Sequence, residues 1–409
     1  PVDPSGERML AETNSEVEPL QLAQLGNLGD RQVDLLAQAH SSVLSDLPAR
    51  SVEAQGASVK EFNVSTGTLV VAGAALVGLA AAAGGGGSSG PRNQTGVVQD
   101  GLVKDATVFI DVNKNGVLDT GEPSTKTDAK GTFTIASDAS GPIVATGGIN
   151  MDTGSANTII LKAQPGSTVV NPITTVVNAL VVEQALTLTA AETAVKSALG
   201  LDSKINLSTY DPFAGTGDVA YQKVAASVAL LASTVASSGS GGGAATFSAL
   251  ATTIKQSSST LDLTKAATLT TVFASVPAIA TQSADLAQKN AAIATASNVA
   301  DIPQKLLDYG VAQLTLSLKV DSGVASDRIT NNGSVVLKDL TGAVVNPTGL
   351  QYSIDGGKSF KADLTTFAAA EGSNSIVLRL VADNGLASKS SAPLTFTVDT
   401  VAPSVPTVG

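Results

Sequence analysis

Residues 111–122 read DVNKNGVLDTGE and carry the most specific chemistry in the chain. Oxygen-bearing side chains occupy its first, third, fifth, ninth and twelfth positions, with glycine at the sixth and an apolar residue at the eighth. This is the spacing of an EF-hand calcium loop. Gly116 suits the sharp turn at the sixth position because glycine tolerates a positive φ. The sequence therefore predicts a calcium site with these ligands: Asp111, Asn113, Asn115, the carbonyl of Val117, Asp119 and Glu122.

The residues on either side of this loop predict strands and not the helices of a helix–loop–helix. Residues 106–110 and 131–135 are rich in β-branched and aromatic side chains. The loop is therefore expected inside a β-hairpin, and Asp128, in the turn that follows, is a candidate for one further carboxylate ligand. A polar hairpin that binds no metal is the alternative interpretation.

Composition narrows the class of protein. The chain has 409 residues, enough for about three domains. Its net charge of −11 argues against a nucleic-acid-binding protein, which needs a basic surface. It contains no cysteine, so it has neither disulfides nor thiolate metal sites. The one histidine, His40, is expected at the surface or at a helix end, and it leaves few options for nucleophilic catalysis. We therefore expect a protein that is not an enzyme.

The first ninety residues differ from the rest. Residues 1–65 are acidic, and their leucines recur at helical spacing. Residues 66–83 have no charge and are rich in alanine and glycine, which fits a short membrane-spanning helix, a buried helix or a segment held in an export channel. Residues 84–90, GGGGSSG, predict a flexible linker.

The remainder predicts a multidomain α+β protein with three folded parts. Short strands between turns in residues 91–163 predict a small calcium-binding β-sandwich. Helical spacing in residues 164–305 predicts an alanine-rich helical bundle. In that bundle Asn171 and Pro172 predict a helix start, Thr189 and Glu192 a capping box, and Gly200 a helix end.

Alternating apolar residues return in 311–402 and predict an immunoglobulin-like β-sandwich. Five aspartates are expected at its turns and strand ends. They either form a second calcium site or are ordinary turn residues: Asp321, Asp327, Asp355, Asp383 and Asp399. The proline-rich residues 403–409 predict the start of a linker to a further domain, so we expect the chain to be the N-terminal portion of a longer protein.

Three segments resemble large bacterial surface adhesins and biofilm-associated proteins. Residues 105–122 with 127–133 resemble the calcium-binding B-type repeat of serine-aspartate surface proteins. Residues 326–333, 352–357 and 398–403 look like bacterial immunoglobulin-like repeats, with Val401 in place of the second threonine of the usual DTTAP motif. The apolar stretch ending at Ala83 and the glycine run after it are similar to the N-terminal region of adhesins exported by type I secretion.

This resemblance implies a non-enzymatic protein of the bacterial cell surface, with calcium as its cofactor. Its N-terminal end would stay at the cell, where residues 66–83 would engage the membrane or the outer-membrane export and retention machinery. The modules that follow would project a distal end that binds a surface or a cell-bound ligand. Self-association is compatible with this picture, and a nucleic-acid partner is not expected.

Two other classes of function remain open from the sequence. A self-assembling surface-layer or filament subunit fits the low charge and the absence of cysteine equally well. An exported enzyme acting on polysaccharide needs a pair of carboxylates in a cleft. The acidic residues of the helical region mostly fall at helix starts or in loops, where caps and turns account for them.

Overall fold

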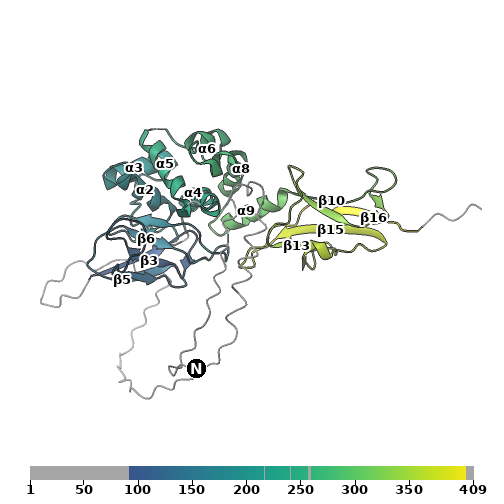
Figure 1. The fold of residues 1–409 in the computed structure, drawn as a ribbon, viewed down its shortest axis with the longest axis horizontal. Helices are drawn as coiled ribbons and strands as arrows, with labels where there is room; N and C mark the ends of the chain where they lie inside the picture. Colours follow the sequence, from purple (N-terminus) through teal and green to yellow (C-terminus); the bar gives the residue numbers. More distant parts are fainter. Residues whose placement is uncertain (1–91, 216, 240, 257–258, 402–409) are drawn as a thin grey trace, which may run out of the picture. The chain divides into compact units, whose positions relative to one another are not determined.

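The computed structural model describes residues 92–401 except 216, 240 and 257–258 (Figure 1). The predictions for residues 1–65, 66–83, 84–90 and 403–409, and for His40, lie outside these described residues. Within them the chain is a mixed α/β protein with eight α-helices and several small open sheets. This agrees with the predicted α+β class at that coarse level.

Nine strands precede the first helix of the described region. One sheet has the order β5-β1-β9, with β1 at Asn93–Val98, β5 at Thr132–Ala136 and β9 at Val169–Val170. A second has the order β4-β3-β6-β8, formed by β4 (Ser124–Lys126), β3 (Thr107–Ile110), β6 (Ile143–Thr146) and β8 (Leu161–Ala163). The short strands β2 (Val103–Lys104) and β7 (Ile149–Asn150) pair with each other.

Seven helices follow these strands and lie beside them (teal and green in Figure 1). They are α2 (Pro172–Val182), α3 (Leu188–Leu199), α4 (Val219–Ser237), α5 (Ala244–Gln256), α6 (Ala266–Val272), α7 (Pro277–Ala280) and α8 (Ser283–Ala294), with a short 3₁₀ turn at Gly241–Gly243 before α5. Helix α2 packs against β8, so the helices cover the strands directly.

The predicted helix ends are confirmed at α2 and at the end of α3. Asn171 caps α2 by accepting a hydrogen bond from the Thr174 amide at 2.9 Å. Gly200 ends α3 in the left-handed conformation, with φ +66. The predicted capping box is wrong, because Thr187 caps α3 two residues before Thr189. Glu192 instead accepts hydrogen bonds from the amide and hydroxyl of Ser208.

The strands and helices share one hydrophobic core. Its buried side chains run from Val98 and Val108 in the strands, through Val176 in α2, to Leu286 and Ala287 in α8. A division into a sandwich at 91–163 and a bundle at 164–305 is therefore not visible in the packing. We call residues 92–300 the α/β module.

Helix α4 is long and apolar enough to cross a membrane by length and composition. Its buried side chains, among them Val228, Leu231 and Val235, belong to the core of the α/β module. A core helix passes the same test, so this finding does not assign α4 to a membrane.

Residues 313–401, the C-terminal module, form two sheets around a second core. One sheet pairs β10 (Leu314–Leu318) with β12 (Val335–Asp339). The other has the order β11-β16-β15-β13-β14, formed by β11 (Ile329–Thr330), β16 (Leu394–Val398), β15 (Gly372–Leu380), β13 (Leu350–Ser353) and β14 (Lys361–Ala362). A 3₁₀ turn occupies Leu364–Thr366. Leu337 of the first sheet and Tyr352, Ile376 and Phe396 of the second are buried together.

Helix α9 (Asp301–Ala312) connects the two modules. At its start, Ile302 is buried with Ile293 and Ala296 beside α4. At its end, Val311 is buried in the core of the C-terminal module. The sequence pattern predicted helices only up to residue 305, so it did not predict a helix that connects the two modules.

Candidate metal centre

The predicted calcium loop is the connection between β3 and β4. Phe109 pairs with Ser124 in this hairpin, and the Ile110 amide donates to the carbonyl of Pro123 at 3.0 Å. The strands therefore hold the two ends of residues 111–122 side by side. This arrangement agrees with the prediction that the loop lies between strands.

Asp111 organises the first half of the loop from a buried position. Asp111 is only 2% exposed, and its backbone amide donates to the carbonyl of Pro142, the residue before β6. Its Oδ1 accepts the Asn115 amide at 3.0 Å, and its Oδ2 accepts the Gly116 amide at 2.8 Å. Gly116 has φ +80, so the glycine serves the turn for which the sequence predicts it.

The side chains at the third, fifth and ninth positions meet at one atom. Asp119 Oδ2 accepts hydrogen bonds from the amide nitrogens of Asn113 and Asn115, at 2.7 and 2.6 Å. The three side chains therefore lie together. The asparagine oxygens accept backbone amides, Asn113 Oδ1 from Asn115 and Asn115 Oδ1 from Val117, so a cation would require both amide groups to turn.

Glu122 closes the loop at its far end. Its Oε1 accepts the Val112 amide at 2.8 Å, and its Oε2 accepts the Asp119 amide at 3.0 Å. Val117, which supplies the predicted carbonyl ligand, has an exposed side chain and donates its amide to Asn115 Oδ1. The loop thus keeps all six predicted ligand residues within one network of short-range contacts.

The donor set fits a calcium ion in its chemistry. Every side chain in the set is a carboxylate or an amide, which are the oxygen ligands that calcium prefers. Among the described residues, none of the three salt bridges involves a loop carboxylate. The same residues contain no cluster of three or more His, Cys, Asp or Glu side chains that already surround one point. Binding would therefore require Glu122 to turn from the amides it now holds toward the other ligands.

Asp128 lies away from this loop. The loop joins the end of the hairpin where Phe109 pairs with Ser124, whereas Asp128 follows Lys126, which pairs with Thr107 at the opposite end. The Thr132 hydroxyl donates to Asp128 Oδ2, and this hydrogen bond holds the pKa of Asp128 below its usual value. The structure thus does not bring Asp128 to the other six candidate ligands.

The five aspartates of the C-terminal module are occupied in separate turns. Four of them accept amide hydrogen bonds from residues two to five positions further along the chain, and Asp383 accepts the Ser155 hydroxyl at 2.7 Å. The four are Asp321, Asp327, Asp355 and Asp399. These contacts favour the interpretation as turn residues over a second calcium site.

The acidic side chains of the helical region also have structural partners. Asp218 caps α4 by accepting the Tyr221 amide, and Asp262 accepts the amide and hydroxyl of Thr264. Asp202 and Asp211 accept amides within their own turns, at 2.9 Å each. Each of these four carboxylates therefore has a hydrogen-bond partner in a helix cap or a turn.

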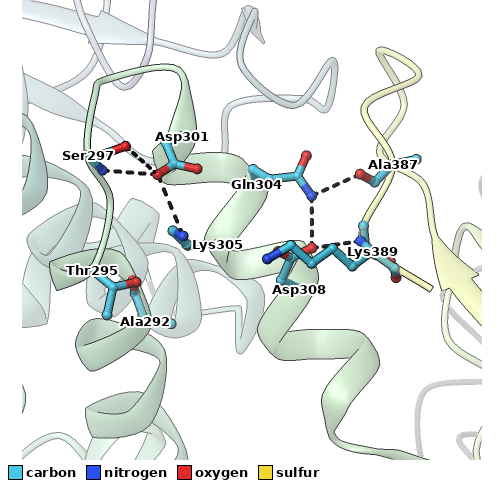
Figure 2. Close-up of polar contacts among 10 residues, drawn as sticks. Ala292, Thr295, Ser297, Asp301, Gln304, Lys305, Asp308, Ala387 and Lys389 are labelled. Atoms are coloured by element: carbon cyan, nitrogen blue, oxygen red, sulfur yellow. Dashed lines mark hydrogen bonds and ion pairs between the residues drawn. The ribbon is translucent and has the colours of Figure 1, made fainter. Parts of the chain in front are cut away.

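Polar contacts join α9 to the C-terminal module, as Figure 2 shows. Asp308 Oδ1 accepts the Lys389 amide at 2.7 Å and the Gln304 side-chain amide at 2.8 Å. Gln304 also donates to the carbonyl of Ala387 at 2.9 Å. At the start of the helix, Asp301 accepts the Ser297 amide and forms a salt bridge with Lys305. The connector is therefore fixed by hydrogen bonds as well as by its two apolar ends.

The structure also brings together Asp100 and Asp152, which the sequence pattern did not single out. Asp100 lies in the turn after β1 and Asp152 in the turn after β7. Burial and the neighbouring Asp152 carboxylate raise the pKa of Asp100 to about 6, and burial also raises the pKa of Asp152. The only signals in the sequence were the Asp-Gly pair at 100–101 and the Asn-Met-Asp run at 150–152, which are common in turns.

Comparisons with known proteins assign no relatives to this chain: no family model matches it, and no curated protein or solved structure is significantly similar.

Proposed function

We propose that this chain is a non-enzymatic segment of a bacterial cell-surface adhesin whose folded modules are stiffened by calcium. The observation that carries the proposal is the arrangement of the 111–122 loop, where Asp119 receives the side chains of Asn113 and Asn115 on one oxygen atom. The resemblance of residues 105–133 to calcium-binding adhesin repeats supports the same assignment.

The chemistry of the loop explains why a cation would stabilise it. Asp111, Asp119 and Glu122 bring three carboxylates into twelve residues, and Lys114 is the one basic side chain among them. Like charges held close together destabilise the folded loop, and a divalent cation removes that repulsion. Because β3 and β4 hold the loop ends, calcium bound in the loop would also hold the hairpin.

The connector supports a mechanical role for the chain. Helix α9 is buried at Ile302 in one cluster and at Val311 in another, so force applied to the C-terminal module is carried into α4 and α8 by packed side chains. A flexible linker would not transmit force in this way. This property suits a segment of a surface stalk.

The proposal is tested by calcium titration of the full chain in a calorimeter, comparing wild type with Asp119→Asn. The asparagine oxygen can still accept from Asn113 and Asn115, so the variant removes the charge and keeps the local hydrogen bonds. Wild type is expected to bind calcium with a Kd of about 10⁻⁴–10⁻³ M, as extracellular modules do. The variant is expected to bind at least about tenfold more weakly, because one of three loop charges is lost.

Two control variants separate loop binding from general effects of charge. Asp105→Asn removes an exposed carboxylate that precedes β3, at a positive φ that asparagine tolerates. Asp128→Asn removes the carboxylate at the far end of the hairpin. Both should keep the wild-type affinity at the loop. The proposal is contradicted if wild type binds no calcium, or if Asp105→Asn weakens binding as much as Asp119→Asn does.

A further inference from the structure

Two turns that are distant in the sequence meet beside Gly101. The Asp152 amide donates to Asn150 Oδ1 at 2.8 Å, and the Asn150 side chain donates to the carbonyl of Asp100. Gly101 has φ +64, and a Cβ atom there would lie 2.6 Å from Asp152 Oδ2. The bare glycine therefore lets the Asp152 carboxylate approach the turn that carries Asp100.

A cavity of about 30 Å³ adjoins these carboxylates. Asp100 and Asp152 line it together with two buried glutamines. Gln99 is 2% exposed and Gln222 is 7% exposed. Gln99 Nε2 donates to Asp211 at 2.7 Å, which leaves Gln99 Oε1 as the atom without a partner. Gln222 Nε2 is also without a partner. Buried polar atoms are almost always paired, so these two atoms indicate a missing occupant. Gln99 Oε1 can ligate a cation directly, whereas Gln222 Nε2 is a donor and would reach the ion only through a water molecule.

The charge around the cavity indicates what kind of occupant is missing. Asp100 and Asp152 are both half-buried, and no salt bridge reaches either of them within the described part of the chain. Two carboxylates and an unpaired amide oxygen form a set of hard oxygen donors, which suits a divalent cation.

We propose that this cavity binds a calcium ion, held by the carboxylates of Asp100 and Asp152 and by Gln99 Oε1. A volume of about 30 Å³ has room for an ion and one water molecule at most. A neighbouring groove of about 310 Å³ shares Asp100, Gly101 and Asp152 with the cavity and gives the ion a route from solvent. This site is separate from the 111–122 loop, and it does not depend on calcium binding there.

The ion would stabilise the turn at residues 152–155, which contacts the C-terminal module. The Asn384 amide donates to the carbonyl of Thr153 at 3.0 Å, and the Asn384 side chain donates to the carbonyl of Asp152 at 2.8 Å. The Ser155 hydroxyl donates to Asp383 at 2.7 Å. Because Asp152 belongs to the same turn, a cation on its carboxylate would fix the residues that hold Asn384.

The test counts the calcium ions bound by the full chain at equilibrium, in wild type, Asp152→Asn, Asp119→Asn and the double variant. Asp152→Asn is expected to bind one ion fewer than wild type, and the double variant one fewer than Asp119→Asn. Asp100→Asn serves as a second variant of the same site, Asp105→Asn as the control, and circular dichroism verifies folding. Calcium should also slow hydrogen exchange of the Asn384 amide in wild type and not in Asp152→Asn.

The outcomes for the two sites are distinguishable. The cavity proposal is overturned if folded Asp152→Asn and Asp100→Asn bind as many ions as wild type, whatever Asp119→Asn does. If Asp119→Asn changes neither the number of bound ions nor their affinities while Asp152→Asn lowers the number, the loop assignment fails and the cavity site is supported.

Discussion

The Asp355 carboxylate closes the turn that follows β13. It accepts hydrogen bonds from the hydroxyls of Ser353 and Ser359 and from the amides of Lys358 and Ser359. These hydrogen bonds, the Ser353 hydroxyl foremost, hold the pKa of Asp355 far below its ordinary value of 3.8. The ionised form is therefore the one that the folded turn stabilises.

This residue gives the C-terminal module a predictable pH dependence. A pKa that is lower in the folded state contributes stability above the unfolded pKa and loses it as the pH falls through the folded value. Asp355→Ala should lower the free energy of unfolding at pH 7, and the difference from wild type should shrink as the pH falls below 3.8. Urea unfolding of wild type and Asp355→Ala, at pH 7 and at a pH below 3.8, measures this difference.

Asp327→Ala is the matched comparison, because Asp327 accepts its amide hydrogen bond from Ile329 alone. Its effect at pH 7 should be smaller than that of Asp355→Ala. A difference between wild type and Asp355→Ala that stays constant from pH 7 to below pH 3.8 would show that the hydrogen bonds do not depend on the charge.

Helix caps offer a comparison at the scale of the element. Asn171 caps α2 from a position only 1% exposed, and its side-chain amide also donates to the Tyr221 hydroxyl at 3.1 Å. Thr187 caps α3 from an exposed position, where its hydroxyl oxygen accepts one hydrogen bond from the Ala190 amide. The two caps share a role and differ in how deeply they are buried.

We expect Asn171→Ala to lower the free energy of unfolding by about 2–3 kcal/mol, since it removes a cap and leaves a buried hydroxyl without its partner. Thr187→Ala should cost about 0.5–1 kcal/mol, because water replaces its hydrogen bond. Chemical denaturation of both variants measures the difference. Equal losses for the two variants would contradict the larger contribution expected of Asn171, which is buried and has hydrogen bonds with both Thr174 and Tyr221.

Local sequence signals predicted the elements whose ends depend on local chemistry. The strands predicted at 106–110 and 131–135 and the start of α2 at Asn171-Pro172 are such cases, because β-branched runs and caps act within a few residues. The start of α3 was predicted two residues late, since Thr187 and Thr189 are both plausible caps and tertiary contacts draw Glu192 to Ser208.

Features that depend on long-range packing could not be predicted in this way. Helix α9 contains Pro303 and Gly310, which weaken a helical pattern, and its two ends are buried by residues from different modules. The loop ligands were predicted because their spacing lies within twelve residues. Asp100 and Asp152 were missed because only the fold brings their turns together.

At the scale of the described molecule, α9 and its hydrogen bonds couple two hydrophobic cores. Asp308 has two contacts across this junction, with the Lys389 amide and with the Lys389 ammonium group at 3.4 Å, and it also accepts the side-chain amide of Gln304 within α9. The Lys389 side chain is 78% exposed, so the ion pair itself contributes little. The hydrogen bond from the Lys389 amide is therefore the stronger of the two contacts that Asp308 makes across the junction.

Asp308→Ala should therefore loosen the coupling between the modules. We expect calorimetric melting of the variant to show the C-terminal module unfolding at a lower temperature, while the α/β module melts as in wild type. The reason is that the Lys389 amide loses a charged acceptor, at a cost of about 1–3 kcal/mol. Lys289→Ala, which removes the exposed salt bridge with Asp285 on α8, is the control and should leave both transitions in place. Unchanged melting of Asp308→Ala would mean that apolar contacts alone hold the junction.

The central claim is that calcium in the 111–122 loop stiffens this protein, and amide hydrogen exchange of the full chain in calcium and in chelator tests it most directly. The amides of Asn115 and Gly116, which donate to Asp111, report on the loop residue by residue. At a hundredfold excess of calcium over Kd, binding to the folded loop alone adds about 2.7 kcal/mol, so exchange through loop opening should slow about a hundredfold. Equal exchange rates for these amides in calcium and in chelator would contradict the claim.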